Sequence, residues 1–229
     1  MPETRTVVRP DGCRFVLGPL DRPLPPGELF ATVDESDDEQ LRALEALGFS
    51  LERRELDLVL ATDARQVPAL TGVEAVRADA VDEEALRLLD DELRQDVPGT
   101  DGWRWTPADF REETYLSSHF DPALYLVAIS GGEQIGICRV WLRPEQPRLG
   151  FIGVRRSSRQ RGIARWLMGE VFAELRARGA AEVRAEVDET NVASRRLLER
   201  LGGRVVGASL ELRRPWAPRP SRALRRTRT

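Results

Sequence analysis

Apolar and polar positions follow two different periods between residues 73 and 215. Apolar residues three and four apart, typical of helices, occur in residues 81–96, 105–116, 163–175 and 191–201. Alternating or continuous apolar runs, typical of strands, occur in residues 124–129, 134–142, 149–154, 182–188 and 204–213. This order of segments predicts an α/β domain with a mixed sheet and flanking helices.

Turn and cap signals separate these segments. Val97-Pro98-Gly99 ends the first helix, and Thr106 before Pro107 is typical of the start of the second. Ser130-Gly131-Gly132-Glu133 predicts a hairpin turn between two strands. Gly179 lies where the helix from Ile163 needs a C-terminal cap.

Residues 1–70 differ from this pattern and are expected to form a separate N-terminal extension. They contain a helical segment, 37–47, then Gly48 and a strand, 51–60. Leu44-Glu45-Ala46-Leu47-Gly48 resembles Leu198-Glu199-Arg200-Leu201-Gly202, and each stretch precedes an alternating strand. The similarity predicts a degenerate half copy of the main domain, residues 72–217. A helix, a glycine and a strand are also a common arrangement, so both interpretations stay open.

Composition and charge exclude several classes of protein. The 229 residues are 41% apolar, with 35 basic and 38 acidic side chains and a net charge of −3. This balance gives no overall affinity for nucleic acid or acidic membranes, and no apolar run has the roughly 18 residues of a membrane span. We expect a cytoplasmic protein. Residues 218–229, rich in arginine, are expected to be a disordered tail.

The few cysteines and the single histidine limit the available chemistry. Cys13 and Cys138 lie far apart, and Cys138 falls in an apolar strand, so we expect reduced thiols rather than a disulfide. His119 and two distant cysteines cannot form a convincing zinc site, and no metal is expected.

The stretch from Phe151 to Arg165 contains the pattern of residues that points most directly to a function. An apolar strand enters a turn containing Gly162, and an amphipathic helix begins there. Backbone N–H groups and the positive end of a helix form a site for phosphate. The spacing Arg159-x-x-Gly162-x-Ala164 resembles the acetyl-CoA pyrophosphate loop of the GNAT superfamily of N-acetyltransferases.

The resemblance implies a GNAT-like fold, with a mostly antiparallel sheet in which the parallel strands 149–154 and 182–188 splay apart. It implies direct transfer of an acetyl group from acetyl-CoA, the co-substrate, to a primary amine within a ternary complex. It also implies which residues bind acetyl-CoA, along the first strand, in the loop and at the next helix: Ile152, Gly153, Val154, Arg159, Gln160, Arg161, Gly162, Ile163, Ala164, Arg165, Asn191 and Ser194.

Asn191-x-x-Ser194 follows the second of these strands and resembles the family's Asn-x-x-Ala/Ser segment. Asn191 also suits a plain helix cap, and the two roles are compatible. The family frequently has a tyrosine seven residues beyond this asparagine, which protonates the departing thiolate. Leu198 stands there in this chain, so the usual general acid is missing.

Glu186 is the candidate general base. It alternates with apolar Ala185 and Val187, so its side chain can face the cleft. Its position resembles that of a catalytic glutamate in the ribosomal-protein alanine acetyltransferases. The alternative is a carboxylate paired with Arg184 or another neighbour. His119 is a second candidate base, although a single histidine in a turn is usually a packed or solvated residue.

The acceptor is expected to be a small-molecule or peptide amine. Aromatic residues in 103–115 lie close to Glu112 and Glu113, which suits a cationic amine, although aromatics on a short helix also suit a core. A catalytically silent acyl-CoA-binding module is the main alternative, and nucleic-acid binding through the arginines of 155–165 is a third. No nucleic-acid or membrane partner is expected, and the oligomeric state stays open, a homodimer included.

Overall fold

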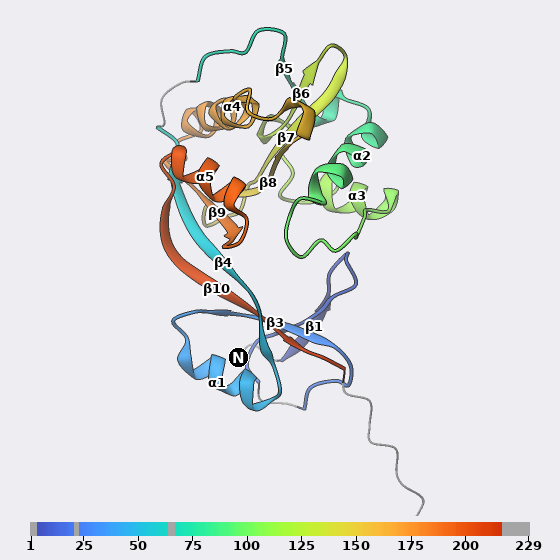
Figure 1. The fold of residues 1–229 in the computed structure, drawn as a ribbon, viewed down its shortest axis with the longest axis vertical. Coiled ribbons are helices and arrows are strands. Elements are labelled where there is room, and N and C mark those ends of the chain that lie inside the picture. The colour runs from blue at the N-terminus through green and yellow to red at the C-terminus, as the bar shows by residue number, and fades with distance from the viewer. Residues whose placement is uncertain (1–3, 21–22, 64–66, 217–229) are drawn as a thin grey trace, which may run out of the picture. The chain divides into compact units, whose positions relative to one another are not determined.

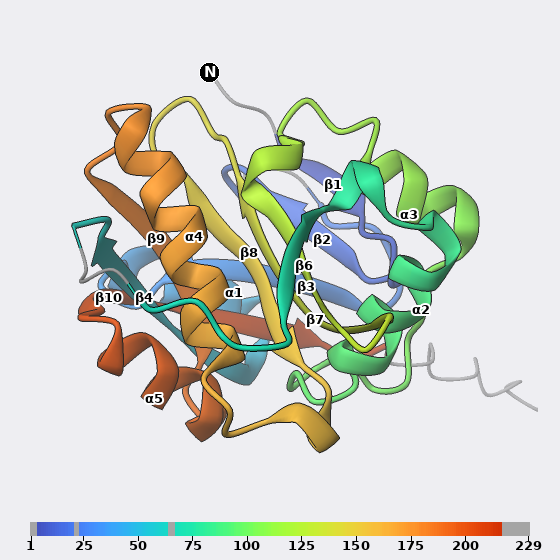
Figure 2. The same ribbon diagram turned by 90° about the horizontal axis from the view of Figure 1, so that it is seen from above.

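The computed structural model describes residues 4–20, 23–63 and 67–216, so the predicted tail lies outside the described residues. The chain forms two compact units (Figures 1 and 2). One unit contains residues 54–209, and the other contains residues 1–53 and 210–229. The division differs from the predicted limit near residue 70, because two long strands each give residues to both units.

The larger unit is built on one sheet, whose strand order is β10-β4-β9-β8-β7-β6-β5. Its strands are β4 (Ser50–Ala61), β5 (Glu74–Arg77), β6 (Tyr125–Ser130), β7 (Glu133–Trp141), β8 (Arg148–Val154), β9 (Glu182–Asp188) and β10 (Arg204–Arg214). Its helices are α2 (Glu83–Arg94), α3 (Pro107–Thr114), α4 (Ile163–Ala177) and α5 (Val192–Arg200). Ladders β4–β9, β5–β6, β6–β7 and β7–β8 are antiparallel, and β8–β9 is parallel.

Helices cover both faces of this sheet (Figure 2). The apolar stripe of α4, including Leu167 and Val171, packs with Leu198 of α5 against one face. Leu86 and Leu89 of α2 pack with Phe110 of α3 against the other. The fold class expected from the sequence is therefore confirmed, since mostly antiparallel strands, one splayed parallel pair and flanking helices are all present.

Strands β8 and β9 are paired over only two residue pairs, at the start of β8. The register joins Arg148 to Arg184 and Leu149 to Ala185, and the parallel ladder ends there. On its other side β8 pairs with β7, where the register shifts and leaves Gly150 as an extra residue. The ring of Trp141 lies so close that a Cβ on Gly150 would come within 2.9 Å of it. The bulge bends β8 as the two strands part.

The smaller unit contains β1 (Arg5–Val8), β2 (Arg14–Leu17), β3 (Leu29–Asp34) and α1 (Asp38–Ala46). The first residues of β4 and the last of β10 complete it. Its own core includes Leu29, Leu44 and Leu212. Glu211 is buried and accepts two hydrogen bonds of 3.0 Å from Arg53.

Helices α1 and α5 end and begin in the same way. Asp37 and Asn191 are their N-caps, each accepting from the backbone N–H three residues on. Gly48 and Gly202, the residues after the C-caps, have φ of +86° and +85°. A strand follows each helix, as the half-copy interpretation expects, and that interpretation stays a prediction.

The caps expected in the larger unit are present. Thr106 accepts a hydrogen bond from Asp109 N–H with Pro107 next in the chain. Helix and strand limits agree with the sequence expectation within about two residues, whereas β1, β2, β3 and β5 were not foreseen. None of the helices within the described residues is both long and apolar enough to cross a bilayer.

Cys138 is buried in the sheet beside Met168, with 3.4 Å between the two sulfurs. Burial raises the pKa of the Cys138 thiol to about 12. Both cysteines are free thiols, as the sequence predicts.

Replacing the buried Leu167 tests the packing of α4 on the sheet. Leu167→Ala should lower the free energy of unfolding by about 2–5 kcal/mol, because it removes buried methyl groups and leaves a cavity. The matched control is Leu88→Ala on α2, where the side chain is 52% exposed and the change should stay within about 0.5 kcal/mol. Urea denaturation measures both; equal effects would contradict this packing.

Candidate functional site

The parting of β8 and β9 opens a cavity of about 120 Å³. Both strands, β4, α5 and the loop after α2 line it: Glu55, Val97, Pro98, Leu149, Gly150, Phe151, Ile152, Glu186, Val187, Asp188, Asn191, Ser194 and Leu198. Ile152, Glu186, Asn191 and Ser194 were all predicted from the sequence as site residues. The cavity therefore brings together residues from four separate segments of the chain.

The edge of β8 that faces the cavity has unpaired backbone groups. Arg155 donates its N–H to Ile135 on β7, and Ile137 lies opposite Gly153 in the same ladder. Because successive backbone groups point to opposite sides of a strand, the N–H groups of Ile152 and Val154 point away from β7, toward the opening. Gly153 N–H then points toward β7 and is not an open donor, and a Cβ on Gly153 would come within 3.1 Å of Leu93 on α2, so its small size allows α2 to pack on β8.

A row of open donors follows at the start of α4. Within the described residues, the backbone N–H groups of 160–165 donate to no protein group. Gly162, the N-cap of α4, has φ of +81°, and Gln160 has φ of +62°. Left-handed residues among ordinary ones turn consecutive N–H groups toward one side, which forms a concave anion site. The α4 macrodipole adds about half a positive charge there.

Asp96 neutralises two arginines of this loop. Its carboxylate, two residues beyond α2, accepts hydrogen bonds from Arg156 and Arg159. Arg159 also donates from Nε to Val154 O at 2.9 Å. The hydrogen bonds from Arg156 and Arg159 lower the pKa of Asp96 to about 2. Because the pKa is lowered, this pairing contributes its full stability to the fold at pH values above the ordinary carboxyl pKa. The contribution is lost only as the pH falls toward 2.

The other arginines near the loop differ in their partners. Arg155 donates from Nε to Glu92 at 3.1 Å. Arg161 and Arg165 are exposed at the start of α4. Three of the arginines in the nucleic-acid alternative, at positions 155, 156 and 159, are therefore in ion pairs with acidic residues, which disfavours that alternative.

Asn191 caps α5 beside the cavity. Its Oδ1 accepts from Ser194 N–H at 3.1 Å, and its own N–H donates to Asp188 O at 2.9 Å. The capping role is thus present, and the residue also lines the cavity. Leu198, two turns beyond Asn191, is buried in the cavity wall, where its side chain offers no acidic proton.

Glu186 lies in the cavity and is paired. Arg148 Nε donates to Glu186 Oε1 at 2.8 Å, across the one place where β8 and β9 are in register. The partner is Arg148 rather than Arg184, so both expectations for Glu186, a cavity residue and a paired carboxylate, describe the same side chain. Arg148 gave no signal in the sequence, because the contact joins residues 38 positions apart.

His119 and the aromatic residues have structural contacts. His119 Nδ1 lies 3.0 Å from Leu142 O at the end of β7. Trp105 and Phe110 are buried in the core under α2 and α3, and Trp105 Nε1 donates to Asp90. Tyr115 donates its hydroxyl to Ala78 O. These side chains build the wall behind the site, and a direct role in binding the acceptor stays a prediction.

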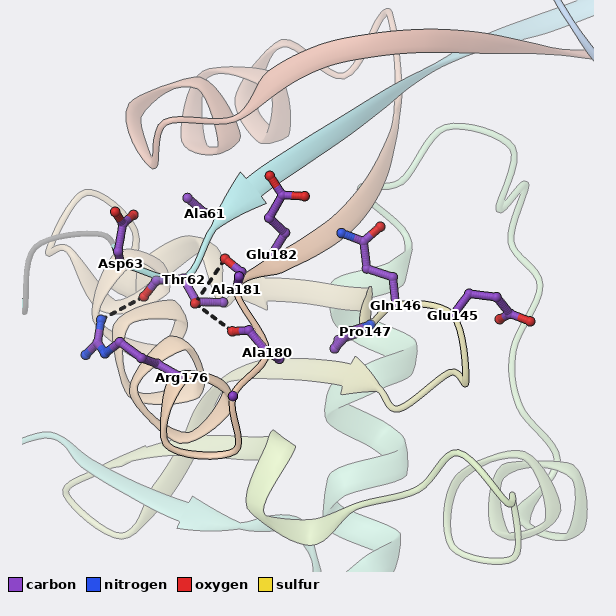
Figure 3. A pocket seen from close by; sticks show the side chains of 11 residues that line it. Ala61, Thr62, Asp63, Glu145, Gln146, Pro147, Arg176, Ala180, Ala181 and Glu182 are labelled. Atoms are coloured by element: carbon purple, nitrogen blue, oxygen red, sulfur yellow. Dashed lines mark hydrogen bonds between the residues drawn. The ribbon is translucent and has the colours of Figure 1, made fainter.

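A larger hollow, of about 730 Å³, lies at the opposite ends of β8 and β9 (Figure 3). Pro147 directly precedes β8, and Glu182 is the first residue of β9. Both line the hollow together with Thr62, which follows β4. Arg176 donates to Thr62 O, and Thr62 Oγ1 donates to Ala180 O. The hollow is wide and lies away from the open backbone N–H groups. Its size alone is therefore not a reason to assign it a function. No cluster of acidic, histidine and cysteine residues suitable for a metal occurs within the described ranges.

Solved structures of the same fold are numerous. A GCN5-related N-acetyltransferase from Sphaerobacter thermophilus is 22% identical, with a TM-score of 0.73 over 94% of this chain and 76% of that one. A GCN5-related N-acetyltransferase from Kribbella flavida is 16% identical, with a TM-score of 0.58 over 82% and 69%. A tandem GNAT protein from the clavulanic acid biosynthesis pathway is 18% identical, with a TM-score of 0.62 over 85% and 66%.

No curated protein matches the chain significantly. The model of the acetyltransferase (GNAT) family matches residues 86–203, just over half of the chain, and this match includes α2, the β8–β9 opening and the loop before α4. The chain therefore belongs to the GNAT family of acetyltransferases.

Proposed function

We propose that this protein is an N-acetyltransferase that transfers an acetyl group from acetyl-CoA directly to a primary amine in a ternary complex. The observation that carries the proposal is the presence of two groups of open backbone donors, one after the other along the chain. They lie at Ile152 and Val154 on the free edge of β8 and at residues 160–165 at the start of α4. An extended arm ending in a pyrophosphate needs donors in this order.

The residues present fit acetyl-CoA, which supplies an acetyl group activated as a thioester. Ile152 and Val154 would bind the pantetheine arm as an added strand binds an edge, and an N–H there would hold the thioester oxygen. The N–H groups of 160–165 would bind the pyrophosphate, and Arg161 and Arg165 are exposed beside them. Asn191 and Ser194 line the opposite wall of the cavity.

Glu186 is proposed as the group that receives the proton of the amine, directly or through a water molecule. Losing that proton at pH 7 costs roughly 4.6 kcal/mol for a lysine-like amine and roughly 1.1 kcal/mol for an α-amine. A carboxylate already paired with Arg148 is a weak base. An α-amine or another amine of low basicity therefore suits this site better than a lysine side chain.

Leu198 favours the silent acyl-CoA-binding module as the second candidate, because no acidic proton is available at that position of the cavity. A thiol of pKa about 8.5 can nevertheless leave as a thiolate and take its proton from water. The missing tyrosine is therefore compatible with turnover.

Thiol release from acetyl-CoA tests the proposal, with amino acids, N-terminal peptides, polyamines and aminoglycosides as acceptors. Calorimetric binding of CoA is measured on the same sample. Binding with turnover on an amine supports the enzyme. Binding without turnover on the whole panel supports the silent module, and absence of CoA binding contradicts both.

Glu186→Gln tests the base. We expect kcat to fall about 10²-fold or more, with the KM for acetyl-CoA changed little, because general-base catalysis contributes on this scale. Glu182→Gln is the matched control, since Glu182 is an exposed glutamate at the start of the same strand. Steady-state kinetics from pH 6 to 9 measure both. An unchanged kcat in Glu186→Gln would assign Glu186 a purely structural role.

Asp96→Asn tests the charge balance of the loop. Freeing Arg156 and Arg159 should tighten CoA binding about threefold to tenfold at low salt, because one negative charge near the phosphates is removed. Since the Asp96 pKa is about 2, the gain should be constant from pH 5 to 8. It should shrink in 0.5 M salt, where the Debye length is only about 4 Å.

The control for Asp96→Asn is Glu74→Gln, which removes one exposed negative charge on β5, three strands from β8. Calorimetry should show an affinity within about twofold of the unmodified protein for this control. Weaker CoA binding in Asp96→Asn would show that Asp96 positions Arg159 for binding rather than competing with the phosphates.

A further inference from the structure

Arg139 is a buried cation without an ion-pair or hydrogen-bond partner. It lies near the end of β7, the residue is 4% exposed, and its Nε atom is buried without a hydrogen bond. Within the described residues its guanidinium has neither an ion pair nor a hydrogen bond. Burying a charge is costly unless it is paired, so proteins rarely leave an arginine in this state without a use for it.

A second unpartnered group lies beside it. Tyr125 on β6 is directly opposite Arg139 in the β6–β7 ladder, and the guanidinium carbon is 5.4 Å from the centre of its ring. The Tyr125 hydroxyl is also buried without a partner. Burial raises the pKa of Tyr125 above its usual range, so the hydroxyl keeps its proton and can donate. Two unused donors thus share one face of the sheet.

The surroundings of Trp141 have an excess of positive charge. The guanidinium carbons of Arg139, Arg143 and Arg148 lie 5.2, 5.6 and 5.2 Å from the centre of its ring. Only Arg148 of these three has a carboxylate partner, Glu186, in the part of the chain that the structure describes. Two positive charges near the indole are therefore not balanced by an ion pair.

This basic group is next to the cavity. Arg139 pairs across the ladder with Phe151 of β8, and Phe151 lines the opening between β8 and β9. Glu186, the proposed base, borders the same opening. Adjacent strands are roughly 4.8 Å apart, so Arg139 lies one strand from β8 and between one and two strand spacings from the opening.

We propose that Arg139 and the Tyr125 hydroxyl bind a carboxylate of the acceptor, so that the acceptor is a short peptide rather than a simple amine. This inference rests on the proposed acetyltransferase function. With the amine at the opening, the carboxylate lies roughly 5–10 Å from it, one to two strand spacings away. An α-amine and a carboxylate separated by several bonds fit, as at the two ends of a dipeptide or tripeptide.

A carboxylate fits better than a phosphate group. The guanidinium carbon lies 5.4 and 5.2 Å from the ring centres of Tyr125 and Trp141, and a guanidinium presents all its N–H groups along its planar edge. A carboxylate is planar and accepts two parallel hydrogen bonds from that edge. The nearly complete burial of Arg139 also favours the smaller, singly charged group.

The first test compares matched acceptors. Acetyl transfer to glycine, diglycine and triglycine is measured beside the C-terminal amide of each, which keeps the α-amine and removes the carboxylate charge. We expect an optimum at diglycine or triglycine, with kcat/KM about 10- to 100-fold above the matched amide, the range of a charged hydrogen bond. Equal rates for acids and amides would overturn the inference.

The second test replaces the cation. Arg139→Met should raise the KM for diglycine about 10- to 100-fold, with the KM for diglycine amide unchanged. Arg139→Lys keeps the charge but loses the planar edge, so its KM should lie between those of the unmodified protein and Arg139→Met. The control is Arg204→Met at the exposed start of β10, four strands from β7, which should change neither. Equal losses for both acceptors, together with a lower melting temperature, would make Arg139 a structural residue and overturn the inference.

A binding measurement separates this inference from the proposed function. Calorimetric titration with diglycine, in the presence of CoA, should show binding to the unmodified protein and none to Arg139→Met. If this result is found while no amine is acetylated, the carboxylate site is supported and the enzymatic function is contradicted. If amines are acetylated but Arg139→Met binds diglycine as the unmodified protein does, the function is supported and the inference is contradicted.

Discussion

Two neighbouring parallel strands, β8 and β9, stay in register for two residue pairs and then separate, and the candidate site depends on that separation. A central strand normally uses the backbone groups on both of its edges. Here the Gly150 bulge, with Trp141 packed against it, turns β8 so that Ile152 and Val154 keep open groups. In the interior of a sheet such groups are costly unless they are paired. The separation therefore gives the fold a preformed edge for an extended ligand.

The arginines on the two sides of this opening differ in whether they are paired with an acidic residue. At the α4 side, Asp96 neutralises Arg156 and Arg159, so the open donors there are chiefly backbone N–H groups and a helix dipole. On the sheet face beside Phe151, Arg139 is buried without a counter-charge. Backbone donors at a helix start suit a phosphate group, whereas a buried guanidinium suits a carboxylate, as we propose for the acceptor.

Much of the fold follows from the sequence because each long element buries one face. Helix α4 and strand β9 show their periods clearly, and Thr106 and Asn191 mark helix starts by their capping chemistry. Strand β1 could not be predicted, because all four of its residues are exposed. The side-chain contacts at the site could not be predicted from the sequence for another reason. Asp96 lies 60 residues from Arg156, and Arg139 stands in an apolar strand whose pattern says nothing of a missing partner.

Hydrogen exchange of backbone amides, with and without CoA, tests the central claim most directly, because the ligand is expected to bind backbone N–H groups. CoA should slow exchange in peptides covering residues 151–165 and leave the β5–β6 ladder, away from the opening, unchanged. Unchanged exchange in 151–165 at saturating CoA, or protection located elsewhere, would contradict the account.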